Sequence, residues 1–172
     1  MPAISMYHAT VPVINQLLGG LIGVLDKAAA HCEAKKIEPT ALLSARLFPD
    51  MFGLIKQVQI ASDQAKGAAA RLTGNEVPTY TDTEVSFADL KGRIQKTLDF
   101  VNSIPADKYA GSDDREIVLQ MRAGPVNFKG LAYLQHFAMP NFYFHVATAY
   151  NILRHNGVEI GKRDFLGKYE TQ

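Results

Sequence analysis

The sequence has a single cysteine, almost no net charge and no long uninterrupted apolar run. Because Cys32 is alone, a disulfide framework and a cluster of thiolate metal ligands are both excluded. We expect it to act as a small buried hydrophobe on the apolar stripe of a helix. With 18 Lys and Arg against 17 Asp and Glu, the net charge is +1, which gives no strong attraction to nucleic acid or anionic membranes. We therefore predict a protein that binds neither.

Targeting and membrane-spanning patterns are also missing. The first residues show no basic segment followed by an apolar stretch, the pattern typical of a secretory signal. Glycines and polar residues interrupt the apolar runs well before the length of a membrane span. We therefore expect a cytoplasmic protein. The length of 172 residues and the hydrophobic content of 47% predict a single domain over 1–172.

The common sequence motifs of phosphate binding and acyl transfer are absent. The glycines of 17–23 match neither the P-loop nor the dinucleotide-binding spacing, and no predicted strand precedes them. There is no Gly-x-Ser-x-Gly nucleophile elbow. The adjacent acids Asp113 and Asp114 lie in a Gly-Ser-Asp-Asp loop, where solvation and capping explain them. No reaction can therefore be predicted from a motif.

Apolar residues spaced alternately by three and four positions predict a long first helix over 14–32. Ser5 is its expected N-cap, and Pro12 requires either a kink or a later start. Small residues in this helix would let a neighbouring element approach closely, and they are Gly19, Gly20 and Gly23.

Three further helices are predicted over 50–74, 86–104 and 140–157. Asp50 is the expected N-cap of the second helix, which ends in a Gly-Asn stop. The third opens with a pattern like a capping box. Pro140 suits the first turn of the fourth, and another Asn-Gly pair ends it.

The segment before the fourth helix predicts a small β-hairpin. Residues 115–122 largely alternate apolar and polar side chains, and Gly124-Pro125 provides a turn before 126–130. The polar segment 73–86 is predicted to be a loop within the domain. Four helices with short first loops and one long last crossover predict an all-α protein, an up-down four-helix bundle with the hairpin in that crossover.

Among the histidines, His145 is the candidate for chemistry. It lies on the bundle-facing side of the predicted fourth helix. Either a core histidine hydrogen-bonded to a neighbour or a ligand or metal role fits this position, and both stay open. His136 precedes it by nine residues, across Pro140, so the two are not expected to share a helix face. The other three are expected in surface or packing roles.

Four segments together resemble one known family. They are 57–72, 136–145, 153–158 and 161–167, and the match extends over essentially the whole chain. The combination resembles the bacterial family catalogued as domain of unknown function 1993, which is placed with the DinB/YfiT-like four-helix bundles. The resemblance implies that fold and makes a homodimer an expectation.

The resemblance also implies where a metal would bind. DinB-like proteins hold a divalent metal with three histidines, one from the second helix and an His-x-x-x-His pair from the fourth. His145 matches the later position of that pair, Asn141 matches the earlier one, and the second-helix position falls near Gln59. One imidazole and two neutral amides would bind zinc or nickel weakly. Asp63, one turn beyond, could replace a ligand or pair with a Lys or Arg.

The resulting prediction is a small-molecule-binding or structural module without a metal or other cofactor. The polar lining of its cavity would be His145, Asn141, Gln59 and Asp63, with hydroxyls from Tyr143 and Tyr150. The alternative is a metal- and thiol-dependent transferase or isomerase in which His145 holds the metal. A carboxylate or His136 would then have to complete the coordination sphere.

Overall fold

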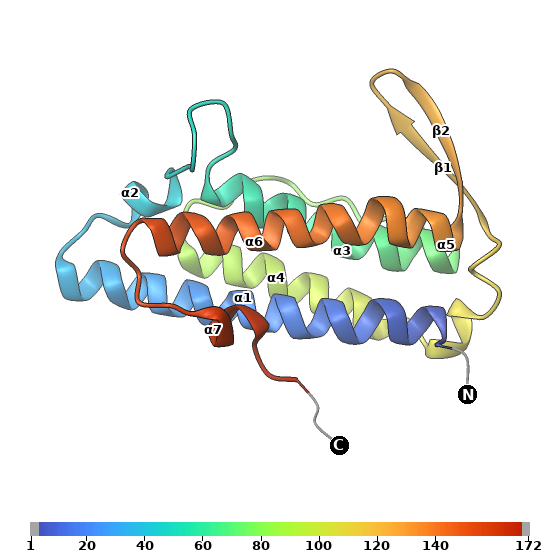
Figure 1. Cartoon of the computed structure of the whole chain (residues 1–172), viewed down its shortest axis with the longest axis horizontal. Helices are drawn as coiled ribbons and strands as arrows, with labels where there is room; N and C mark the ends of the chain where they lie inside the picture. The colour runs from blue at the N-terminus through green and yellow to red at the C-terminus, as the bar shows by residue number, and fades with distance from the viewer. Residues whose placement is uncertain (1–3, 170–172) are drawn as a thin grey trace.

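Four long helices lie side by side in the computed structural model, which describes residues 4–169 (Figure 1). They are α1 (Met6–Lys35), α3 (Leu54–Thr73), α4 (Phe87–Ser103) and α6 (Met139–His155). A two-stranded hairpin projects at one end of the bundle. The prediction of a four-helix bundle with a hairpin before the last long helix is confirmed.

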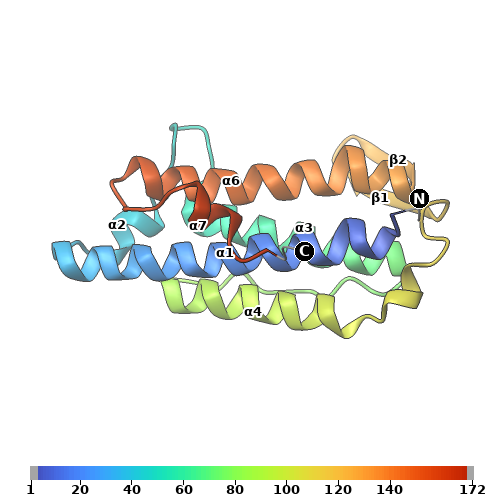
Figure 2. The same ribbon diagram turned by 60° about the horizontal axis from the view of Figure 1, so that its bottom comes forward.

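The helices run in an up-down-down-up order. Asn15 and Asn102 exchange side-chain hydrogen bonds, and Lys91 pairs with Asp26, so α1 and α4 are antiparallel. Helices α3 and α4 run the same way, and α6 runs with α1 (Figures 1 and 2). The chain between α3 and α4, residues 74–86, therefore travels back along the bundle. The long crossover lies in this connection, not in the last one as the sequence predicted.

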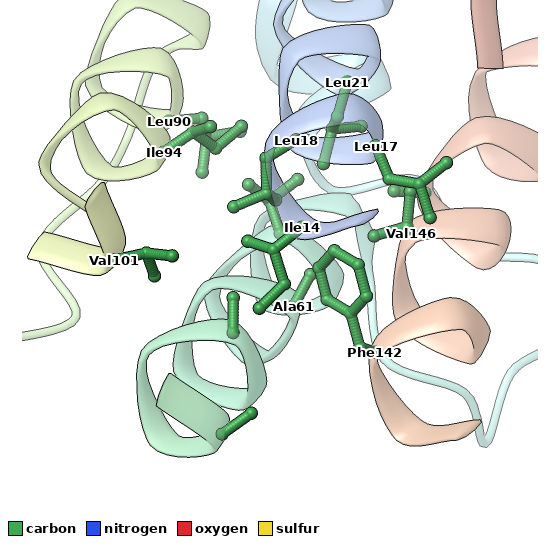
Figure 3. Packing of buried hydrophobic residues seen from close by; sticks show 14 of the residues in the cluster. Ile14, Leu17, Leu18, Leu21, Ala61, Leu90, Ile94, Val101, Phe142 and Val146 are labelled. Carbon is green, nitrogen blue, oxygen red and sulfur yellow. The ribbon is translucent and has the colours of Figure 1, made fainter. Parts of the chain in front are cut away.

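The apolar stripe predicted for α1 forms one wall of the core. Figure 3 shows Ile14 and Leu18 of α1 facing Leu90 of α4, Ala61 of α3 and Phe142 of α6. The stripe residues are all buried, and they are Ile14, Leu18, Leu21, Leu25, Ala28 and Cys32. Cys32 is thus a buried thiol, and burial raises its pKa.

Helix α1 starts where its cap predicts. Ser5 accepts a hydrogen bond from the backbone N–H of His8 at 3.2 Å, and the helix continues through Pro12. The later start that Pro12 suggested is wrong. Pro12 and His8 are both exposed, so the His8 carbonyl, which loses its helical partner, faces solvent.

The start of α3 was predicted three residues too early. Its N-cap is Gly53, not Asp50, and the N–H of Leu54 donates to the carbonyl of Ala45. This tertiary contact holds 44–53 as a loop. It follows a short helix that the sequence analysis missed, α2 (Pro39–Leu43), which has proline in its first turn.

The last helical segment begins ten residues before Pro140. It consists of α5 (Gly130–Tyr133), a π turn η2 (Leu134–Ala138) and then α6. In the π turn the N–H of Met139 donates to the carbonyl of Leu134, five residues back. Pro140 therefore lies in the first turn of α6, as predicted, but the helical backbone that leads into it from α5 through the π turn was not predicted.

The hairpin consists of β1 (Glu116–Met121) and β2 (Gly124–Lys129), paired antiparallel. Met121 pairs with Gly124, so the connecting residues are 122–123, and not Gly124-Pro125 as predicted. Gly124 adopts a φ of 116° at the start of β2, which favours glycine. A short 3-10 helix, η1 (Ala106–Tyr109), links α4 to the hairpin segment.

A short last helix, α7 (Lys162–Leu166), packs on α1. A Cβ atom on Gly20 would lie 2.8 Å from the carbonyl oxygen of Phe165. Gly167, at a φ of 64°, approaches the same turn of α1. The close approach predicted for the α1 glycines is therefore confirmed at Gly20, whereas a Cβ on Gly19 would meet nothing within 4 Å.

Judged by length and composition alone, helix α1 could cross a membrane. The sequence analysis did not predict this, because it found only short apolar runs. The most apolar 18-residue window of α1 has a mean hydropathy of 1.4, and half of that window is buried inside the bundle. The buried core helix of a soluble bundle has the same properties, so this single helix is only a weak indication.

The neighbouring glycines of α1 provide a matched test of the α7 contact. Gly19→Ala should raise the free energy of unfolding by about 0.5–1 kcal/mol, because alanine has a higher helix propensity than glycine and this position is exposed. Gly20→Ala should lower it by about 1 kcal/mol, since overpacking against α7 outweighs the same gain. Urea unfolding of both variants checks this, and equal stabilisation by both would contradict the contact.

Candidate functional site

His145 lies on the α3-facing side of α6 and is 9% exposed. Its Nδ1 is 2.7 Å from Oε1 of Gln57 on α3. The amide of Gln57 is oriented by a second contact, because its Nε2 donates to the carbonyl of Phe52 at 3.0 Å. An amide oxygen can only accept, so Nδ1 of His145 carries the proton and Nε2 keeps a lone pair.

The protonation state of His145 follows from its burial. Removal from water disfavours the imidazolium and lowers the pKa of His145 below its usual value of 6.5. No hydrogen bond to Nε2 forms within residues 4–169. At neutral pH the ring therefore offers one unprotonated nitrogen as a hydrogen-bond acceptor.

One aromatic ring and one amide of the same helix lie next to His145. Phe144 meets the ring of His145 edge to face at a centroid distance of 5.2 Å and is 54% exposed. Phe52, whose backbone carbonyl orients Gln57, is 56% exposed. Asn141, one turn earlier on α6, donates through Nδ2 to the carbonyl of Phe137 at 2.7 Å, which leaves its Oδ1 available as an acceptor.

The residues beside His145 do not fit a divalent metal. Gln57, and not Gln59, is the α3 residue that contacts His145. His136 lies exposed on the π turn. Over residues 4–169 no group of three or more His, Cys, Asp or Glu side chains comes together in a metal-binding arrangement. One imidazole with neighbouring amides is a weak donor set for zinc or nickel.

The other two predicted site residues belong to a separate polar cluster. Gln59 donates to Oε2 of Glu84 at 2.7 Å, and Asp63 pairs with Lys66 at 2.7 Å and with Arg93 at 3.0 Å. Of the two roles considered for Asp63, the structure therefore shows the pairing with cations. The four predicted residues thus divide between the His145 position and this cluster.

The centre of the cluster is the guanidinium of Arg93, whose side chain is 2% exposed. It reaches carboxylates on two segments, Asp63 of α3 and, from the crossover, Asp82 at 3.1 Å and Glu84 at 3.0 Å. Lys56 pairs with Asp82 in turn. A buried charge needs such partners, because an isolated one would be very unstable away from water.

Two of the carboxyl groups that pair with Arg93, those of Asp82 and Glu84, have lowered pKa values. For Asp82 the hydrogen bond from Lys56 is the largest cause, and Arg93 adds to it. For Glu84 burial acts upward, but hydrogen bonds from Gln59 and Arg93 outweigh it and the pKa falls. These groups are therefore ionised and serve as counter-ions in the fold.

Sequence reasoning missed Gln57 and Arg93. Arg93 lies directly before Ile94 and three residues after Leu90, on the apolar face of α4. A cation at such a position signals that carboxylates must converge on it. Gln57 gives no comparable signal, because its role depends on the loop carbonyl that orients its amide.

Comparisons with known proteins agree with this architecture. The family described as "Domain of unknown function (DUF1993)" matches residues 6–166. A crystal structure of a DinB family member protein from Shewanella denitrificans is 40% identical, with a TM-score of 0.91 over 97% of this chain and 94% of that chain. No functionally curated protein matches.

The His145 geometry predicts a specific NMR signature. In ¹⁵N-resolved ring spectra His145 should be the Nδ1–H tautomer at pH 7, and its pKa should lie below 6.5. The Gln57→Leu variant, which keeps the volume but removes the acceptor, should shift the ring toward the other tautomer. An unchanged tautomer in that variant would show that Gln57 does not orient the ring.

The Arg93 cluster predicts a pH-dependent loss of stability. Arg93→Met should lower the free energy of unfolding by about 3–5 kcal/mol at pH 7, since it leaves the largely buried carboxylate of Glu84 without a cationic partner and Asp63 and Asp82 with one lysine each. Lowered carboxyl pKa values stabilise the fold above the unfolded values near 4, and this contribution is lost as the pH falls through the folded values. The difference between wild type and variant should therefore shrink toward pH 3.5. Urea unfolding at both pH values measures it.

The exposed Arg122→Met variant is the control for that experiment. It removes the same charge from the hairpin and should leave stability within about 0.5 kcal/mol of wild type at both pH values. A deficit for Arg93→Met that stays constant with pH would contradict the charge-pairing account.

Proposed function

The chain belongs to the DUF1993 family, and we propose that it is a small-molecule-binding bundle whose site is the His145–Gln57 pair. The observation that carries this proposal is the fixed tautomer of His145. The N–H at Nδ1 of His145 donates to the amide oxygen of Gln57, so the lone pair of Nε2 remains available to a ligand. A neutral imidazole oriented in this way is suited to accept one directed hydrogen bond.

The surrounding side chains define the ligand chemistry. The ligand would bring a hydroxyl or N–H group to Nε2 of His145. Oδ1 of Asn141, on the same helix, offers a second acceptor. The exposed ring of Phe144, which meets the imidazole edge to face, supplies apolar contact area. An uncharged molecule with a donor group and an aromatic or aliphatic part fits this combination.

The alternative, a metal- and thiol-dependent transferase or isomerase, requires His145 to act as a metal ligand. A neutral imidazole with a free Nε2 is able to coordinate a metal. Its neighbours are the obstacle, because Gln57 and Asn141 are amides and His136 is exposed on a different turn. The donor set therefore favours binding without a metal.

Two probe molecules test the proposed site. Benzyl alcohol, which has a donor and a ring, should shift the Nε2 resonance of His145 in a saturable manner. Benzyl methyl ether, which lacks the donor, should not. The His145→Gln variant should lose the response, whereas His155→Gln, an exposed change at the end of the same helix, should keep it. Equal shifts with both molecules would contradict a directed hydrogen bond.

The metal content of the untagged protein separates the two functions. After dialysis against zinc and nickel, mass spectrometry should find no stoichiometric ion. About one ion per chain that is lost in His145→Ala would overturn the proposal and support the transferase. The homodimer and the cytoplasmic location stay predictions, and sedimentation measurements would check the first.

A further inference from the structure

A concave region lies between α1 and α7, away from His145. It encloses about 440 Å³, within the range of pockets that bind small molecules. Its floor is a turn of α1, and its wall is the segment that follows α6. None of its lining residues belongs to the His145 position or to the Arg93 cluster.

The floor of this α1–α7 cleft is bare backbone. Gly19 and Gly23 line it, and a Cβ on either would meet nothing within 4 Å, so both face open space. Because Gly20 and Gly167 have no side chains, the α7 segment that forms the wall can approach α1 closely. Gln16 completes the attachment, because its Nε2 donates to the carbonyl of Leu166 at 3.0 Å. A ligand can therefore approach α1 more closely than a helix with side chains allows.

The rim of the cleft carries an excess of positive charge. Lys27 is neutralised by Asp164 at 2.7 Å. Arg163 and Lys168 also line the cleft, and within residues 4–169 neither forms an ion pair. The whole chain has a net charge of only +1, so this excess is local. Two cations facing one cleft attract an anion.

We propose that the α1–α7 cleft binds a small molecule through an oxyanion group, a phosphate or a carboxylate. The guanidinium of Arg163 would bind the oxygens in a forked geometry, and Lys168 would add a second charge. This recognition differs from a P-loop, which the spacing of the glycines excludes. The charge comes from the α7 segment, and the glycines contribute space.

NMR titration of the full-length protein tests the site. Inorganic phosphate and acetate are added separately, with chloride keeping the ionic strength at about 0.1 M. The amide signals of Gly19, Gly20, Gly23 and Gly167 should shift in a saturable manner with at least one of the two anions. The anion that binds more tightly identifies the group that the cleft prefers.

Paired variants separate specific binding from screening. Arg163→Gln with Lys168→Gln should weaken binding about tenfold. Arg122→Gln with Lys108→Gln removes the same two charge types from exposed positions elsewhere and should leave the affinity unchanged. Both pairs are exposed, and circular dichroism confirms that they fold.

Two outcomes would overturn the proposal. One is that neither anion moves the four glycine signals. The other is that both variant pairs weaken the response equally, which would indicate only general electrostatic attraction. Neither outcome involves His145, so the proposed function stands or fails independently.

Discussion

The buried guanidinium of Arg93 is the constraint on which the path of the chain depends. A cation that is 2% exposed has to find its counter-charges nearby, and α3 supplies only Asp63. The others come from the crossover, which must therefore return along the bundle to bring Asp82 and Glu84 to α4. That return makes α3 and α4 parallel. The up-down-down-up order of the helices is thus linked to the need to pair the buried charge of Arg93.

The same crossover, residues 74–86, covers a side of α3. Tyr80 of this segment lies between two cations, with Lys66 Nζ at 4.2 Å and Lys96 Nζ at 4.3 Å from its ring centroid. Helix α3 packs against α4 on one side and α6 on another, so few of its side chains reach water. Polar residues on such a helix need partners. Gln57 and Gln59 point to different sides of α3. Gln57 is hydrogen-bonded to His145 of α6, and Gln59 is hydrogen-bonded to Glu84 of the crossover.

Elements with local causes could be predicted from the sequence, and those with tertiary causes could not. The α1 stripe and the Ser86 cap depend on residues within a few positions, and both were correct. The start of α3 depends on the Ala45 carbonyl, and the helical backbone that leads into Pro140 contains a π turn. The candidate site divides in the same way. His145 was found from its helix face, but its partner Gln57 depends on a loop carbonyl.

The π turn also explains how α6 brings its histidine to α3. Two side-chain hydrogen bonds join α3 to the continuous helical segment formed by α5, the π turn and α6: Arg71 with Tyr133 of α5, and Gln57 with His145 of α6. In a regular helix, positions twelve apart differ by about 120° in direction, so both side chains could not face one neighbour. A π turn adds one residue, which makes the separation equivalent to eleven positions and reduces the difference to about 20°. On α3, Gln57 and Arg71 differ by only about 40°, so the two pairs of side chains face each other. The π turn, which the sequence did not predict, is therefore what places His145 against Gln57.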